Sequence, residues 1–152
     1  MEDMLVRLAV RINSFAYADG TKAMGKIDID IGKGEFIGIL GSNGSGKTTL
    51  LKIMDGLIKN FEGAVYLDGR DVRELSPKEI FRKVGLVFQN PDEQLFAGSV
   101  ADDVAFGPLN MGLRSNEVAQ RVREALDDVD MSGCEAKSIH NLSYGQKKRV
   151  CI

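Results

Sequence analysis

The stretch GSNGSGKT, from Gly41 to Thr48, decides how the rest of the chain is interpreted. It follows an apolar run from Phe36 to Leu40, which is typical of a strand buried on both faces of a parallel sheet. It leads into a segment from Lys47 to Leu57 in which apolar residues recur at helical spacing. A strand, a glycine-rich loop and a helix in this order form the context of a phosphate-binding loop. The sequence therefore predicts an α/β fold and a nucleoside triphosphate ligand.

The residue types of this loop match the chemistry of triphosphate binding. Gly41, Gly44 and Gly46 have no Cβ, so the backbone can turn its N–H groups toward an anion. The positive end of the helix and the Lys47 ammonium would add to these donors, and the Thr48 hydroxyl is placed to ligate Mg²⁺. An ordinary glycine-rich surface loop is the competing interpretation, and the fit of the flanking segments argues against it. The residues expected to contact the nucleotide are Gly41, Ser42, Asn43, Gly44, Ser45, Gly46, Lys47, Thr48 and Thr49.

Composition narrows the class of protein. With 152 residues the chain has room for one domain at most, because domains typically hold about 100 to 200 residues. The net charge of −2 offers no broad positive field, which argues against a nucleic-acid partner. No apolar stretch approaches the roughly 18 residues that cross a bilayer, and the N-terminus MEDMLVRLAV is too charged for a signal peptide. We therefore expect a soluble, cytoplasmic protein that does not insert into a membrane.

The first half of the chain carries strand patterns. Apolar and polar residues alternate from Met4 to Asn13 and again from Lys26 to Ile31, and Asp19-Gly20 between them indicates a turn. These segments predict an antiparallel hairpin ahead of the glycine-rich loop. Ala64 to Leu67 predicts another short strand, and the apolar run from Val84 to Phe88 predicts a further one that ends at Gln89.

The second half loses its strand patterns from about Ser99 onward. Asn90-Pro91 indicates a loop after Gln89, and residues from Asn116 to Asp130 have the pattern of an amphipathic helix with a solvated charged face. Both predicted helices are expected to bury one apolar face, made of Leu50, Leu51, Ile53, Met54 and Leu57 in the first and of Val118, Val122, Leu126 and Val129 in the second.

A second motif, LSYGQ, runs from Leu142 to Gln146. Ser143 and Gln146 have the spacing of a capping box, in which each side chain satisfies a backbone N–H group at a helix start. Such a helix would present its positive end, a hydroxyl and the Gly145 backbone to a second anion. The basic run from Lys147 to Arg149 falls in the predicted first turn, where cations oppose the helix dipole, and a nearby anion would explain it.

With these motifs in this order, the whole chain resembles the ATP-binding subunits of ABC transporters. GSNGSGKT resembles the Walker A motif, Gln89 the Q-loop glutamine, and LSYGQKKRV the signature LSGGQ with its basic tail. Tyr17 resembles the aromatic residue that stacks on adenine, with an ordinary strand or turn tyrosine as the alternative. The stretch from Val87 to Gly107 is similar to cobalt-type and energy-coupling-factor importers, which take up transition metals or vitamins.

The resemblance implies ATP and Mg²⁺ as ligands and a head-to-tail dimer. ATP on the Walker A motif of one subunit is covered by the signature of the other, through Ser143, Gly145 and Gln146. Lys47 and Gln89 are the implied catalytic residues, and Gln89 positions the attacking water and joins Thr48 as a ligand of Mg²⁺. The implied partners are a second ATP-binding subunit, identical or different, and membrane-embedded transporter subunits that hold the chain peripherally on the inner face of the membrane.

The chain departs from the family pattern in two places. Tyr144 stands at the third position of LSGGQ, whereas the two residues expected to face phosphate, Ser143 and Gly145, are retained. The sequence stops at Ile152 inside a helix pattern, before the family's Walker B carboxylates, D-loop and switch histidine. His140 precedes the signature and is expected to be a capping or surface residue. We therefore expect the N-terminal part of such a subunit, which binds nucleotide weakly and hardly hydrolyses it.

Three alternatives stay open at this point. A chromosome-maintenance or DNA-repair ATPase also pairs the two motifs, but it separates them by a long coiled coil, and the sequence has no sustained heptads. The second alternative is a non-hydrolysing nucleotide-binding fragment or regulatory remnant of such a subunit. The third is an artificially shortened form of a normal subunit.

The expected organisation is one partial ABC ATPase domain. It divides into a β subdomain with the P-loop core (residues 1–98), a helical subdomain (99–141), and the signature with the start of its helix (142–152). Because the C-terminal part of the sheet is missing from this sequence, apolar edges are expected to be exposed. We therefore expect marginal stability and a tendency to self-associate.

Overall fold

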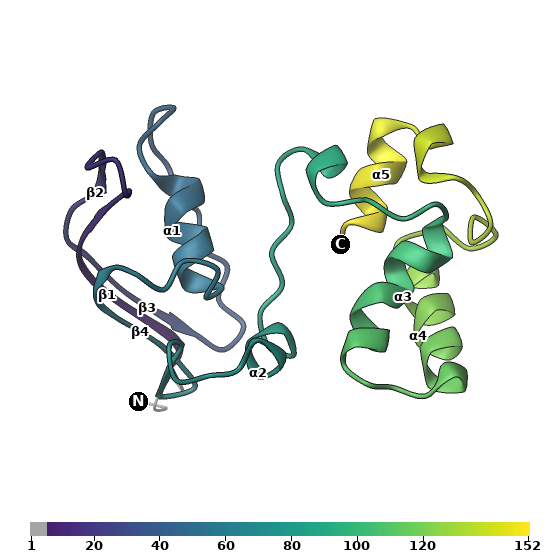
Figure 1. Ribbon diagram of the computed structural model, residues 1–152, viewed down its shortest axis with the longest axis horizontal. Coiled ribbons are helices and arrows are strands. Elements are labelled where there is room, and N and C mark those ends of the chain that lie inside the picture. Colours follow the sequence, from purple (N-terminus) through teal and green to yellow (C-terminus); the bar gives the residue numbers. More distant parts are fainter. Residues whose placement is uncertain (1–5) are drawn as a thin grey trace. The chain divides into compact units, whose positions relative to one another are not determined.

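The computed structural model describes residues 6–152, which form two compact units (Figure 1). The first unit ends at Leu86, and the second runs from Val87 to Ile152. Each unit has its own hydrophobic core. Met4 and Leu5, with which the first predicted strand begins, lie outside the described residues. The finer division at residues 98 and 141 stays a prediction.

The first unit is built on an antiparallel sheet in which β1 is central. The strands are hydrogen-bonded in the order β2-β1-β4-β5, and β3 also pairs with β1. The turn after β1 contains Gly20 at φ 85°, a left-handed conformation that glycine adopts without strain. The predicted hairpin at Asp19-Gly20 is therefore confirmed. The strands are β1 (Val6–Ala16), β2 (Lys22–Met24), β3 (Ile27–Gly32), β4 (Glu62–Leu67) and β5 (Arg70–Asp71).

The alternation along β1 separates the two faces of this sheet. Val10 is fully buried and lies opposite Ile29 in β3 and Val65 in β4. The next residue, Arg11, projects from the other face because side chains alternate along a strand. There its Nη2 lies 2.7 Å from Asp30 Oδ1, within a half-exposed ion pair. The period-two prediction for both strands is confirmed, and the apolar face of the sheet is the one that carries the core.

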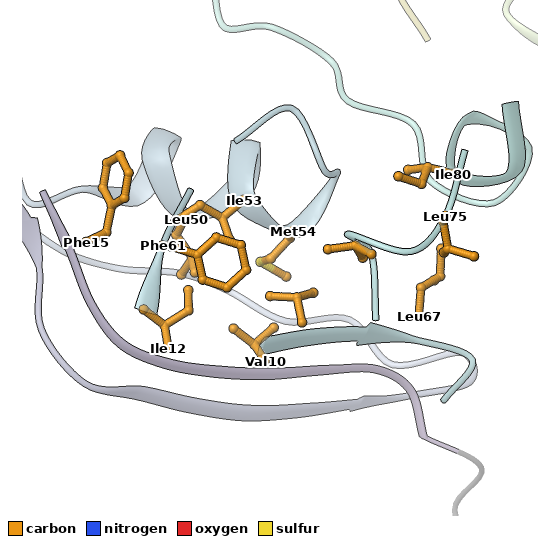
Figure 2. Packing of buried hydrophobic residues seen from close by; sticks show 12 residues of the cluster. Val10, Ile12, Phe15, Leu50, Ile53, Met54, Phe61, Leu67, Leu75 and Ile80 are labelled. Carbon is orange, nitrogen blue, oxygen red and sulfur yellow. The ribbon is translucent and has the colours of Figure 1, made fainter. Parts of the chain in front are cut away.

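Helix α1 (Lys47–Met54) covers this apolar face (Figure 2). The prediction for its buried face is correct for three of the five positions and wrong for Leu51 and Leu57, which are 39% and 52% exposed. The helix ends at Met54 and Gly56 then takes φ 75°, so helical spacing no longer applies at Leu57. The core of this unit consists of Val10, Ile12, Phe15, Leu50, Ile53, Met54, Phe61, Val65, Leu67, Val72, Leu75 and Ile80.

The runs Phe36–Leu40 and Val84–Phe88 do not form the predicted strands. No ladder among residues 6–152 includes them, and Phe36 and Leu40 are almost entirely exposed. An apolar run favours burial, but a strand also needs hydrogen-bonded neighbours, and none of the described strands lies beside these runs. The two strand predictions are therefore wrong for the described residues, whereas the α/β class and the antiparallel subdomain are confirmed.

The second unit is helical, as predicted from Ser99 onward. Helix α3 packs against α4 (Figure 1), and Val118, Val122 and Leu126 of α4 are buried. Its charged residues are exposed, so the amphipathic prediction is confirmed. No helix among residues 6–152 is both long and apolar enough to span a bilayer. Helix α2 (Pro77–Phe81) belongs to the first unit, and the second contains η1 (Pro91–Glu93), α3 (Val100–Asn110), α4 (Ser115–Asp128), η2 (Ile139–Asn141) and α5 (Tyr144–Val150).

Candidate functional site

The glycine-rich loop closes around the side chain of Lys47. The Lys47 ammonium donates to the carbonyl oxygens of Gly41 at 2.8 Å and Ser42 at 2.7 Å, and it lies 3.4 Å from Ser45 Oγ. A cation is therefore held at the centre of the loop by the loop's own oxygens. The tight path of the backbone depends on Gly44 and Gly46, which both have positive φ.

Neighbouring atoms approach two of the glycines closely. A Cβ on Gly46 would lie 2.5 Å from the carbonyl oxygen of Ala23 in β2, and a Cβ on Gly41 would lie 2.7 Å from Ser45 Oγ. The first contact involves backbone, which cannot rotate away. At Gly46 only glycine avoids this contact, so the backbone of the loop lies close against β2. We call residues 41–49 the cradle, and a glycine-rich backbone of this kind can turn its N–H groups toward a phosphate.

The N-terminus of α1 has backbone donors without a side-chain cap. Gly46 is the N-cap residue in a left-handed conformation, and it has no side chain that could accept from the first turn. The first turn of α1 also contains no acidic residue. Free N–H groups and the positive end of the helix dipole form an anion site, which suits the phosphate contacts predicted for this loop.

Thr48 and Thr49 have different surroundings at the start of α1. Thr48 is exposed, so its hydroxyl is accessible to a metal ion, whereas Thr49 is buried. Thr49 Oγ1 is 2.5 Å from Tyr17 Oη, and the Tyr17 ring packs edge-on against Phe15. Tyr17 therefore lies beside the loop with 45% of its surface exposed. Its stacking on adenine stays a prediction.

The predicted signature forms the expected capping box. The Ser143 N–H donates to Gln146 Oε1 at 2.9 Å, and the Gln146 N–H donates to Ser143 Oγ at 3.3 Å. Helix α5 is therefore capped by its own side chains, in contrast to α1. Gly145 and Ser143 are exposed, and their contacts with a nucleotide stay predictions. His140 is exposed in η2, so it is the surface residue that was expected.

One residue of the basic run after the signature pairs with a carboxylate. Lys147, Lys148 and Arg149 lie in α5, three to five residues after its N-terminal residue Tyr144. Lys147 Nζ pairs with Asp92 Oδ1 at 2.6 Å. For Lys147 the nearby anion is thus a carboxylate of the chain itself, whereas an anion beside Arg149 stays a prediction.

The structure ties Gln89 to α5 through contacts that sequence patterns did not reveal. Tyr144 Oη donates to the Gln89 carbonyl at 3.1 Å, although the two residues are 55 positions apart. Gln94 joins the same region by accepting from the Phe88 N–H at 3.0 Å. No local spacing signals such long-range pairs. The predicted residues thus fall into two groups, one around Lys47 in the first unit and one around Gln89 and Ser143 in the second.

Sequence comparisons connect these features with known proteins. The family model described as ABC transporter matches residues 24–152. A protein of Geobacter sulfurreducens named as an ABC transporter ATP-binding protein is 63% identical over 147 residues, which cover 97% of this chain and 53% of the relative. The energy-coupling factor transporter ATP-binding protein EcfA of Methanothermobacter thermautotrophicus is 46% identical over 148 residues, which cover 95% of this chain and 47% of EcfA.

Two solved structures share the fold. The cbiO1 protein from Clostridium perfringens, part of the ABC transporter complex cbiONQ, superposes with a TM-score of 0.80 at 40% identity, covering 96% of this chain and 59% of that one. The ATP-binding cassette MJ0796, in a dimeric post-hydrolysis state bound to ADP and Pi, superposes with a TM-score of 0.77 at 26% identity, covering 96% and 66%.

The chain spans about half the length of the sequence relatives it matches. The resemblance inferred from the motifs is confirmed, including its similarity to energy-coupling-factor and CbiO proteins. A family model that matches most of the chain, together with relatives at this level of identity, leads to one conclusion: the chain belongs to the ABC transporter family.

Proposed function

We propose that this chain forms part of the ATP-binding subunit of an importer of the energy-coupling-factor or cobalt type. The subunit couples the binding and hydrolysis of ATP to the uptake of a transition metal or a vitamin. The observation that carries the proposal is the cradle from Gly41 to Thr49, whose oxygens hold the Lys47 ammonium at its centre. The printed names of EcfA and cbiO1 support the transporter class.

In this proposal residues of the first unit bind the phosphates and the adenine, and Gln89 of the second unit acts on the magnesium ion and the water. Lys47 and the uncapped N–H groups of α1 hold the β- and γ-phosphates, and Tyr17 stacks on adenine. Thr48 of the first unit and Gln89 of the second are the residues that would hold Mg²⁺, and the ion would neutralise negative charge on the phosphates. Gln89 also orients the attacking water. The chain's contribution to the reaction is thus positioning and electrostatic stabilisation, because phosphoryl transfer needs little covalent chemistry from the protein.

The proposed partners are a second ATP-binding subunit and membrane-embedded subunits. Ser143, Gly145 and Gln146 would cover the nucleotide of the facing subunit, and the dimeric state in which MJ0796 was solved with ADP and Pi supports such an arrangement. The cbiO1 protein is part of a multi-component transporter complex, which supports the membrane partners. The proposed location is the inner face of the cell membrane, with the ATP-binding subunit held there by its partners.

A non-hydrolysing nucleotide-binding fragment is the alternative function. It shares the cradle around Lys47, so nucleotide binding does not separate the two proposals. Turnover does, because the alternative predicts ATP binding by the natural gene product without phosphate release. Loss of the gene without any change in the uptake of transition metals or vitamins would contradict the importer proposal.

The test of the cradle is the replacement Lys47→Ala in the natural protein. Ligand at 100 times its dissociation constant stabilises a folded protein by about 2.7 kcal/mol. We expect ATP with Mg²⁺ to stabilise the wild type by this amount and the variant far less, because the charge at the centre of the cradle is lost. Unfolding in urea with and without nucleotide measures the difference.

Lys33→Ala is the matched control, because Lys33 is an exposed lysine in the turn after β3. It removes the same charge and should leave the nucleotide effect intact. An equal nucleotide effect in Lys47→Ala and wild type would overturn the assignment of the loop.

A further inference from the structure

Three residues on one face of α5 hold the segment around Gln89. Lys147 and Lys148 lie three and four positions after Tyr144, so both side chains project beside that of Tyr144 on the helix surface. Tyr144 Oη donates to the Gln89 carbonyl at 3.1 Å, and Lys148 Nζ donates to the carbonyl of Phe88 at 2.6 Å. Two consecutive backbone carbonyls are therefore bound by one helix.

Three further contacts hold the loop on the C-terminal side of Gln89. Lys147 Nζ pairs with Asp92 Oδ1 at 2.6 Å, and the Lys147 side chain is only 16% exposed. Gln94 accepts from the Phe88 N–H at 3.0 Å and donates to the Cys151 carbonyl at 2.8 Å. We call these residues the clasp, and its members are Phe88, Asp92 and Gln94 in the loop and Tyr144, Lys147 and Lys148 in α5.

The clasp holds Gln89 by its backbone carbonyl and leaves the Gln89 side chain exposed. Bonds in which one partner is charged are stronger than neutral ones, and the clasp contains two such bonds from lysines. Tyr144 is the member that binds Gln89 itself. A glycine at this position, as in LSGGQ, has no side chain that reaches the Gln89 carbonyl.

We infer that Tyr144 is a positioning residue for Gln89, and that the clasp makes the Gln89 loop move together with α5. The effect of this contact on catalysis rests on the proposed function of Gln89. Gln89 then serves the nucleotide of its own subunit, while Ser143 at the start of the same helix contacts the nucleotide of the facing subunit. The clasp links these two sites because Tyr144 donates to the Gln89 backbone carbonyl. A glycine at position 144 could not make this hydrogen bond.

The first test is amide hydrogen exchange in the natural protein with Tyr144→Phe, which removes only the hydroxyl. The Phe88 N–H bonds to Gln94 and the Gln94 N–H to Pro91, so both report opening of the loop. Loss of one hydrogen bond should accelerate their exchange about fivefold. Tyr66→Phe is the matched control, because Tyr66 is a partly exposed tyrosine on β4. In this variant the Phe88 and Gln94 amides should exchange at the wild-type rates. Unchanged exchange in Tyr144→Phe would overturn the inference.

The second test measures ATP turnover in the same variants. A positioning role predicts a kcat about fivefold lower in Tyr144→Phe, with an unchanged KM for ATP and an unchanged melting temperature. The double variant with Lys148→Met should lose less than the product of the two single effects, because both residues hold one loop. A rise in KM together with a lower melting temperature would assign Tyr144 a structural role only and overturn the inference. If the wild type binds no ATP, the proposed function fails. The exchange experiment still tests whether Tyr144 holds the Gln89 loop, because it needs no nucleotide.

Discussion

At the residue scale, two glycines of the cradle are needed for different reasons. Gly44 has φ 79°, and a Cβ there would meet nothing within 4 Å. Gly46 has φ 88°, and a Cβ there would also collide with the Ala23 carbonyl. A left-handed conformation costs other residues about 1–2 kcal/mol. Gly46 thus combines conformational strain with a close approach of backbone, and it fixes where the loop meets β2.

This difference predicts unequal effects of two identical substitutions. Gly44→Ala should lower the free energy of unfolding by about 1–2 kcal/mol, through strain alone. Gly46→Ala should cost clearly more, because β2 has to shift as well. Urea unfolding of both variants measures the costs. If the two substitutions cost the same, the contact with Ala23 does not constrain the loop.

At the element scale, capping boxes organise the short helices. The sequence pattern at Ser143 and Gln146 was recognised, and the same pattern at Ser76 and Glu79 caps α2. Hydrogen bonds from the Ser76 backbone N–H and then from Arg70 lower the pKa of Glu79 from 4.5 to about 2. Asp55, at the end of α1, shows the opposite case, because burial raises the pKa of its carboxyl.

These two carboxyls predict opposite dependences of stability on pH. Glu79 binds protons less readily in the folded state, so its stabilising effect is complete above pH 4.5 and is lost as the pH falls to about 2. Glu79→Gln should therefore destabilise the protein at pH 6 and converge with the wild type near pH 2. Urea unfolding across this range is the measurement, and a gap that does not depend on pH would refute the role of the charge.

Asp55→Asn is the counterpart with the reverse sign. Because the folded state favours protonation of Asp55, its unfavourable effect develops as the pH rises through the raised pKa. The amide keeps an oxygen that accepts from the Leu57 N–H, as Asp55 Oδ1 does at 3.0 Å. Asp55→Asn should therefore stabilise the protein at pH 7, and this gain should shrink in acid.

At the scale of the whole molecule, the described chain leaves an apolar segment uncovered. Phe36 and Leu40 are almost entirely exposed, and Ile37 is 42% exposed. The backbone of this segment pairs with no strand among residues 6–152. Apolar side chains beside unpaired backbone groups favour association with other chains. The exposed segment is not itself a strand of the sheet, so the exposure of apolar sheet edges, the marginal stability and the self-association stay predictions.

Self-association of the 152-residue chain should depend on this segment. The double substitution Phe36→Lys and Leu40→Lys should increase the fraction of monomer in analytical ultracentrifugation, because charged side chains oppose edge pairing. Leu109→Lys on α3 is the control, since Leu109 is 54% exposed in the other unit. A wild-type chain that is monomeric at every concentration, with a cooperative melt at high temperature, would contradict the prediction.

The sequence by itself determined the features that depend on neighbours a few positions apart. The glycine-rich loop, the cap at Ser143, the alternation of β1 and the apolar face of α4 are of this kind, because backbone conformation and side-chain period are local properties. Only the tertiary structure decided the rest. Lys147 finds Asp92 and Tyr144 finds Gln89 across 55 positions, and the run from Phe36 to Leu40 forms no strand because strand formation requires a partner that an apolar pattern cannot supply.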